Sequence, residues 1–172
     1  ERPRARELGI VVGAFQPGPL NAITDVPGVR VGHATVVRGD SIRTGVTVIF
    51  PHADNPFESR VPAAAAVGNG FGKFVGYTQL TELGGLETPI ALTNTLCVWR
   101  VAESIVRWMR GLPGMENVRS VNPVVAETND GWNLNAIRSM PVTEKHLLQA
   151  LETATAGPVA EGSVGAGAGA TV

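Results

Sequence analysis

The sequence has little that would suit it to nucleic acid or to a membrane. Aromatic residues make up only 5% of the 172 residues, and the formal net charge is -1. The chain therefore offers neither a stacking platform for bases nor a basic surplus for phosphates. No apolar run approaches the ~20 residues that a membrane-spanning helix needs. We expect neither a nucleic-acid partner nor a membrane partner.

Cysteine is nearly absent as well. Cys97 is the single cysteine, which excludes an internal disulfide and fits a reducing compartment, so we expect a cytoplasmic protein. The chain begins without a methionine and without the apolar core of a signal peptide, and we expect the gene product to start earlier. An apolar fraction of 44% with 17% charged residues is typical of a globular chain. The length suits one domain over residues 1–172.

Motifs for metals, cofactors and a serine triad are also missing. The three histidines, His33, His52 and His146, are widely spaced from one another and from Cys97. We therefore expect no metal site, and structural or surface roles for the histidines. The glycine pattern at 68–73 lacks the Ser or Thr that follows the lysine of a phosphate loop, so no nucleotide cofactor is expected. Close approach of this backbone to a ligand or to another strand stays open. No serine lies in a GxSxG elbow, which disfavours a self-contained serine hydrolase.

What the sequence does contain is a series of strand-like runs with two helices among them. β-Branched runs bounded by glycine and proline predict strands, and apolar residues at three- and four-residue spacing predict helices. This arrangement predicts an α/β fold with helices layered on a sheet. Segment 63–77 is predicted as a strand pair or as a chain lying close to another backbone. Strands are expected around 29–31, 36–37, 44–51, 89–95, 123–128 and in the last segment from 157, a short element closing at Gly84 and Gly85, and helices at 96–110 and after Pro141 with Thr143 as N-cap.

Four polar residues, 127–130, close the strand predicted at 123–128. The carboxylate of Glu127 could bind a substrate amine through a charge-assisted hydrogen bond. The amide of Asn129 could donate to a developing oxyanion. The same residues could equally form a simple turn, since Asn and Asp tolerate turn geometry. Two interpretations also hold for Asn94, which could serve a ligand or cap the helix that follows it.

Six stretches in a fixed order cover nearly the whole chain and carry a family resemblance: NAITDVPGVRVGHATV (21–36), RTGVTVIFP (43–51), VGNGFG (67–72), TNT (93–95), NPVVAET with the following DG (122–131) and VAEGSVGAGAGA (159–170). Together they resemble the DmpA-like self-processing aminopeptidases, the family of L-aminopeptidase/D-esterases and β-peptidyl aminopeptidases. The resemblance implies a four-layer α/β/β/α sandwich, a type shared with ornithine acetyltransferases. It also implies a precursor that cleaves itself before a Ser or Thr.

In the family that this chain resembles, the Ser or Thr freed by cleavage begins the smaller chain and is the nucleophile. A free α-amine with a pKa near ~8 can act as base for its own hydroxyl, so no histidine is required. The resemblance places this nucleophile beyond the present sequence, on a companion chain. Residues 1–172 would then be part of the larger piece and hold no catalytic nucleophile, with Ser163 and Thr171 structural. It also implies a homo-oligomer.

The resemblance also implies which residues bind the substrate. Glu127 matches the family glutamate that holds the substrate's amino group, while Asn69 and Asn94 lie within the matching GNG and TNT motifs. Asn129 stands where the family usually has an aromatic residue, often an active-site tyrosine. This departure fits a divergent member such as the pantetheine hydrolase of carbapenem antibiotic biosynthesis, and we weigh that hydrolase equally with an aminopeptidase of small peptides. A non-catalytic binding domain and a related acyltransferase are the alternatives.

Overall fold

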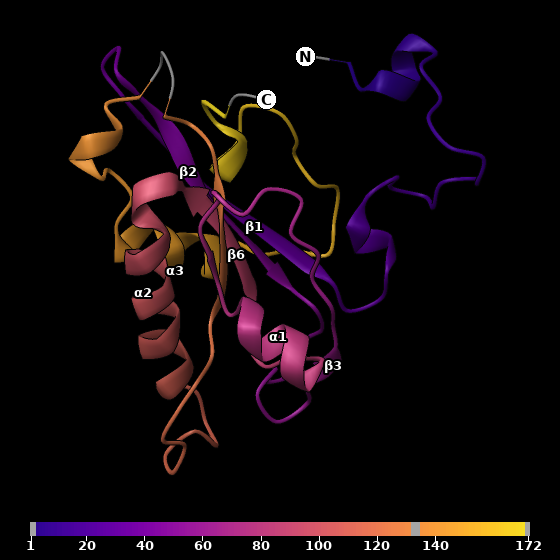
Figure 1. Ribbon diagram of the computed structural model, residues 1–172. Coiled ribbons are helices and arrows are strands. Elements are labelled where there is room, and N and C mark those ends of the chain that lie inside the picture. Colours follow the sequence, from indigo (N-terminus) through magenta and orange to yellow (C-terminus); the bar gives the residue numbers. More distant parts are fainter. Residues whose placement is uncertain (1–2, 132–134, 171–172) are drawn as a thin grey trace.

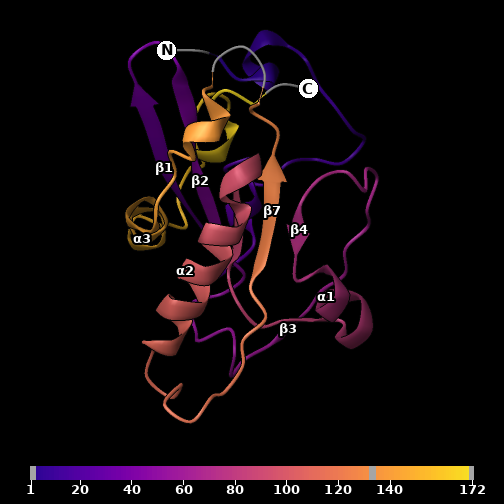
Figure 2. The same cartoon turned by 60° about the vertical axis from the view of Figure 1, so that its left-hand side comes forward.

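The computed structural model describes residues 3–131 and 135–170 of the chain, which adopts the α/β fold expected from the sequence (Figures 1 and 2). Its main element is a five-stranded mixed sheet in the order β1-β2-β6-β7-β4. All neighbours in this sheet are antiparallel except β6 and β7, which run parallel. The strands are β1 Arg30–Arg38, β2 Ile42–Phe50, β4 Phe74–Val75, β6 Ile90–Asn94 and β7 Val124–Thr128.

Strand β1 is continuous, although the sequence predicted two short pieces. The prediction was wrong because β1 pairs with β2 along its whole length, from Arg30 opposite Phe50 to Arg38 opposite Ile42. The apparent break contains Gly32, where a Cβ would collide with the carbonyl oxygen of Ala150 in the covering helix. A glycine that weakens the strand pattern locally is therefore what lets that helix pack closely on β1.

Two helices cover one face of the sheet (Figures 1 and 2). Helix α2 (Val98–Arg110) follows the short 3₁₀ turn η3 (Thr95–Cys97), which confirms the helix predicted at 96–110. Helix α3 (Glu144–Glu152) has Thr143 as its N-cap, as predicted, and the backbone N–H of Thr143 donates to Nδ1 of His146. The core between helices and sheet is formed by fully buried apolar side chains, among them Val46, Val48, Val98, Val101, Ile105, Met109, Val125 and Leu147.

Segment 63–77 does not form the strand pair that the sequence allowed. Only β4 pairs there, with Phe74 opposite Ala126 and Val75 opposite Val125. A third helix, α1 (Tyr77–Leu83), begins directly afterwards. Gly76 and Gly84 bound it at φ +87° and +63°. Gly84 ends this element, as predicted. Its helical conformation was not predicted, because seven residues are too few to show the apolar spacing of a helix.

A smaller ribbon and a second cluster lie beside α1. Strands β3 (Val61–Pro62) and β5 (Gly85–Leu86) form a two-stranded sheet. Leu80 of α1 packs with Leu86 and with Val124 of β7 in a cluster separate from the main core. Figure 1 shows α1 and the N-terminal segment on the opposite side of the sheet from α2 and α3.

The glycine-rich last segment is not the predicted strand. It forms a 3₁₀ turn, η5 (Gly165–Gly167), packed against β1 and β2. Its backbone N–H groups donate to side-chain hydroxyls and not to the backbone carbonyls of a neighbouring strand. Gly165 donates to Oγ1 of Thr35 at 2.8 Å, and Ala166 donates to Oγ1 of Thr47 at 3.0 Å. A Cβ at Gly165 would clash with Thr47 and His33, so this contact needs glycine. In the part of the chain that is described, no helix combines the length and apolarity needed to cross a membrane.

Candidate functional site

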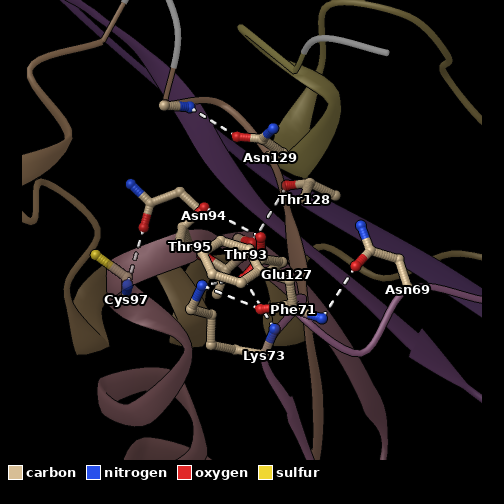
Figure 3. Close-up of polar contacts among 11 residues, drawn as sticks. Asn69, Phe71, Lys73, Thr93, Asn94, Thr95, Cys97, Glu127, Thr128 and Asn129 are labelled. Carbon is tan, nitrogen blue, oxygen red and sulfur yellow. Dashed lines mark hydrogen bonds and ion pairs between the residues drawn. The ribbon is translucent and has the colours of Figure 1, made fainter. Parts of the chain in front are cut away.

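The polar motifs of two strands meet at one edge of the sheet. Because β6 and β7 are parallel, their carboxyl ends lie side by side, with Thr93 opposite Glu127 and Asn94 opposite Thr128. The glycine-rich loop before β4 joins them, since the backbone N–H of Glu127 donates to the carbonyl of Lys73 at 3.0 Å. Three motifs that are far apart in sequence therefore form one site (Figure 3).

Glu127 is at the centre of this site and its side chain is only 13% exposed. One carboxylate oxygen, Oε2, accepts the backbone N–H of Lys73 at 2.9 Å and lies 3.4 Å from the Lys73 ammonium. The other oxygen, Oε1, accepts the hydroxyl of Thr95 at 3.4 Å (Figure 3). A carboxylate held by a backbone amide and a hydroxyl is oriented to bind a cation.

A cleft of about 490 Å³ opens beside Glu127. Asn69 lies in its wall, so the structure brings two of the four predicted substrate-binding residues to the same cleft. The Asn69 side chain accepts the backbone N–H of Phe71 at 3.0 Å and thereby shapes the loop. The cleft is lined by Ala66, Val67, Gly68, Asn69, Gly70, Gly72, Lys73, Phe74, Tyr77, Ala126 and Glu127.

Asn94 does not line this cleft. It is fully buried, and its Oδ1 accepts the backbone N–H of Cys97 at 3.0 Å. This contact makes it the N-cap of η3, which leads into α2, so the structure supports the capping interpretation. Its Nδ2 has no hydrogen-bond partner among the described residues. By fixing the turn after β6, Asn94 sets the position of Thr95 against Glu127.

Asn129 lies just beyond β7, away from the residues that line the cleft (Figure 3). Its side chain is exposed, and Oδ1 accepts the backbone N–H of Gly131 at 3.2 Å. This is the turn geometry weighed for residues 127–130. Residues 132 and 133 of the same motif lie outside the described residues.

Asp130 is the last of the four polar residues 127–130, and its burial was not predicted from the sequence. It is 0% exposed, and neither of its carboxyl oxygens has a hydrogen-bond partner among the described residues. Burial raises the pKa of the Asp130 carboxyl, and the nearby side chains of Thr44 and Asn94 act in the opposite direction. In the sequence, Asp130 lies two residues after the end of β7 and directly before Gly131, a pattern typical of an exposed turn. Only the three-dimensional packing shows that its side chain is buried.

No described side chain has the setting of an activated nucleophile. Burial raises the pKa of the Cys97 thiol, which keeps it in the unreactive protonated form. The His33 ring contacts the Thr47 hydroxyl at 2.9 Å, but Thr47 also accepts the backbone N–H of Ala166 and lies under η5. Ser163 is exposed in the loop before that turn, and Thr171 lies outside the described residues.

The histidines make structural contacts. His52 Nε2 contacts the carbonyl of Ser59 at 2.6 Å, and its Nδ1 accepts the backbone N–H of Asp54 at 3.1 Å. His146 completes the cap of α3. Within residues 3–131 and 135–170, no group of three or more His, Cys, Asp or Glu side chains could hold a metal ion.

Comparison with known proteins gives a consistent family. A family model described as peptidase family S58 matches residues 21–172. The curated β-peptidyl aminopeptidase BapA of Sphingosinicella microcystinivorans is 41% identical over 98% of this chain and 43% of that protein. The chain thus spans less than half the length of this curated relative.

Solved structures match as well. A β-aminopeptidase of a Burkholderia species superposes with a TM-score of 0.88 at 48% identity, covering 95% of this chain and 46% of that one. The L-aminopeptidase D-Ala-esterase/amidase of Ochrobactrum anthropi superposes with a TM-score of 0.86 at 36% identity, covering 96% of this chain and 48% of that one. The latter is described as a prototype for the serine aminopeptidases and a new variant of the Ntn hydrolase fold.

Proposed function

Because the chain belongs to peptidase family S58, we propose that the complete protein is an aminopeptidase that hydrolyses an amide bond in a small substrate carrying a free amine. The observation that carries this proposal is the Glu127 carboxylate, oriented by Lys73 and Thr95 at the wall of a cleft. A substrate ammonium on Glu127 would fix the position of the amide to be cleaved. The names of the Sphingosinicella and Burkholderia relatives favour an amine in the β position.

The nucleophile in this proposal is a Ser or Thr at the N-terminus of a companion chain, freed by self-cleavage of a common precursor. Its α-amine takes the hydroxyl proton while the oxygen attacks the amide carbonyl. The amine product leaves with a proton as the acyl-enzyme ester forms. Water then cleaves the ester, which releases the acid and restores the hydroxyl. Residues 1–172 supply the substrate cleft of the larger piece.

The three asparagines have different parts in this proposal. Asn129 is exposed at the end of β7, outside the cleft lining, and is a candidate donor to a substrate carbonyl or oxyanion that extends beyond the cleft. Asn69 shapes the cleft wall through its contact with Phe71. Asn94 acts as a positioning residue, because its cap on Cys97 places Thr95 against Glu127.

We further propose that the companion chain completes a four-layer α/β/β/α sandwich and that paired chains form a cytoplasmic homo-oligomer. Support for the sandwich comes from the match to the Ochrobactrum enzyme, which has a variant of the Ntn hydrolase fold. The second candidate activity is hydrolysis of a pantetheine-type amide, as in carbapenem antibiotic biosynthesis. It is favoured by Asn129, which replaces the aromatic residue usual in the family, and by the cation that already neutralises Glu127.

Paired substrates test the proposal on the complete protein. β-Alanyl-p-nitroanilide carries the amine, and propionyl-p-nitroanilide lacks it at the same acyl length. We expect Glu127→Gln to lower kcat/KM roughly 100-fold for the first substrate, as loss of a partly buried ion partner does, and much less for the second. Glu103→Gln, which breaks only an exposed pair with Arg107, is the control.

An equal loss on both substrates would remove the amine-binding role, and preferred cleavage of a pantetheine amide would favour the second candidate. No hydrolysis at all would point to a binding domain, and acyl transfer to an added amine to an acyltransferase.

A further inference from the structure

The carboxylate proposed to bind the substrate amine already has a cation beside it. The Lys73 ammonium lies 3.4 Å from Oε2 of Glu127, and the two side chains are 24% and 13% exposed. The same oxygen accepts the backbone N–H of Lys73 at 2.9 Å (Figure 3). The cleft therefore contains an internal competitor for whatever cation a substrate brings.

A second ammonium beside the same carboxylate would be unfavourable. In a partly buried site the repulsion between two like charges is screened less than in water. The carboxylate can neutralise only one unit of charge, so an incoming ammonium gains little while Lys73 stays in place. Binding of an amine therefore favours departure of the Lys73 side chain from Glu127.

The geometry lets that side chain leave while its backbone stays. The carbonyl of Lys73 accepts the backbone N–H of Glu127 at 3.0 Å, and the Lys73 N–H donates to the Glu127 carboxylate, so the main chain is held twice. In the same position the ammonium has partners besides Glu127: it donates to the carbonyl oxygen of Phe71 at 3.3 Å and lies 4.5 Å from the centre of the Phe71 ring. Phe71 is 85% exposed at the edge of the loop, and a cation over an aromatic ring is stabilised there.

We infer that Lys73 is a specificity-determining residue, an exchangeable counter-ion that occupies Glu127 in the empty cleft and gives way to the substrate amine. This inference rests on the proposed role of Glu127. When the ammonium leaves Glu127, it keeps its contacts with the carbonyl oxygen and the exposed ring of Phe71. The exchange sets a threshold for amine substrates, because each must compete with a tethered cation. Substrates without an amine leave the Lys73–Glu127 pair intact.

Replacement of Lys73 in the complete protein tests this exchange. Lys73→Met keeps an unbranched side chain and both backbone contacts but removes the competing charge. We expect KM for β-alanyl-p-nitroanilide to fall roughly two- to fivefold, the range of a partly exposed ion pair. KM for propionyl-p-nitroanilide should not change. Lys73→Arg should keep the wild-type KM, and Lys145→Met, which alters the other lysine of the chain on the exposed face of α3, is the matched control.

Inhibition by β-alaninamide measures amine binding without turnover of an amine substrate. Its inhibition constant, measured against propionyl-p-nitroanilide, should fall by the same factor in Lys73→Met. An unchanged or raised constant, or an equal change in KM for both anilides, would overturn the inference. If Lys73→Met shows a lowered unfolding temperature, Lys73→Gln takes its place in the same assays.

The roles of Glu127 and Lys73 can be tested separately. If Glu127→Gln affects amine and amine-free substrates alike, the proposed role of Glu127 is wrong and the inference falls with it. If Glu127→Gln is selective for the amine while Lys73→Met leaves both KM and the inhibition constant unchanged, only the exchange at Lys73 is wrong.

Discussion

The hydroxyl of Thr95 donates to Oε1 of Glu127 across 3.4 Å and so ties the turn after β6 to the end of β7. The Lys73 backbone holds the other carboxylate oxygen at 2.9 Å. Glu127 is thus oriented from two sides by groups that lie far from it in sequence. This arrangement is what makes its carboxylate a candidate binding group instead of a solvated surface charge.

Removing the Thr95 hydroxyl should weaken amine binding. Thr95→Val preserves the shape of the side chain but leaves Oε1 without this donor. We expect KM for β-alanyl-p-nitroanilide to rise about three- to tenfold, the worth of an ordinary hydrogen bond, because this contact is long at 3.4 Å. The change for propionyl-p-nitroanilide should be smaller. Steady-state kinetics on the complete protein measures both, and Thr95→Ser, which keeps the hydroxyl, serves as control. An unchanged KM in Thr95→Val would mean that the contact does not orient Glu127.

The buried carboxyl of Asp130 should make stability depend on pH. Its folded-state pKa is raised by burial, so the folded protein binds the proton more tightly than the unfolded chain does. The stabilisation is therefore fully present below the ordinary value of about 3.9 and is lost as pH rises through the raised pKa. Asp130→Asn lacks this proton equilibrium. Urea unfolding between pH 4 and pH 7 should show the wild type losing stability relative to Asp130→Asn as pH rises. A difference that stays constant across this range would contradict the assignment.

The last turn, η5, should depend on a glycine at one position and much less at another. Gly165 and Gly162 have φ of +54° and +85°, so an alanine at either carries the cost of a left-handed backbone, about 1 kcal/mol. A Cβ at Gly165 would in addition clash with Thr47, His33 and the carbonyl of Val46. A Cβ at Gly162 would have no neighbouring atom within 4 Å. We expect Gly165→Ala to destabilise the protein by about 3 kcal/mol and Gly162→Ala by about 1 kcal/mol. Chemical denaturation measures the two values, and equal costs would show that η5 does not pack on β2 as described.

The elements with a long local period were predictable from the sequence. Helix α2 and strands β6 and β7 lie where apolar spacing placed them, since their core contacts repeat within a few residues. Helix α1 was missed because it has only seven residues between two glycines. The apolar, glycine-rich composition of the last segment predicts a strand, but composition does not show that the N–H groups of Gly165 and Ala166 bind Thr35 and Thr47.

The site could be predicted only in part. Glu127 was predicted from the polar strand end and from the family resemblance, and Asn69 from the resemblance alone; the structure puts both at one cleft. The Lys73–Glu127 pair carried no local signal, because the two residues are 54 positions apart and meet only through the pairing of β4 with β7. Asp130 was hidden for a similar reason, since its burial depends on packing near Asn94 and Thr44 and not on any period in its own segment.

Intact mass spectrometry of the freshly purified, denatured complete protein, with N-terminal sequencing, tests most directly whether this chain belongs to a self-processed hydrolase. We expect two polypeptides from one precursor, the smaller beginning with Ser or Thr. Substitution of that residue by Ala should leave the precursor uncleaved and abolish amide hydrolysis. A single uncleaved polypeptide in the active wild-type protein would contradict the N-terminal-nucleophile mechanism and leave Glu127 as the binding group of some other chemistry.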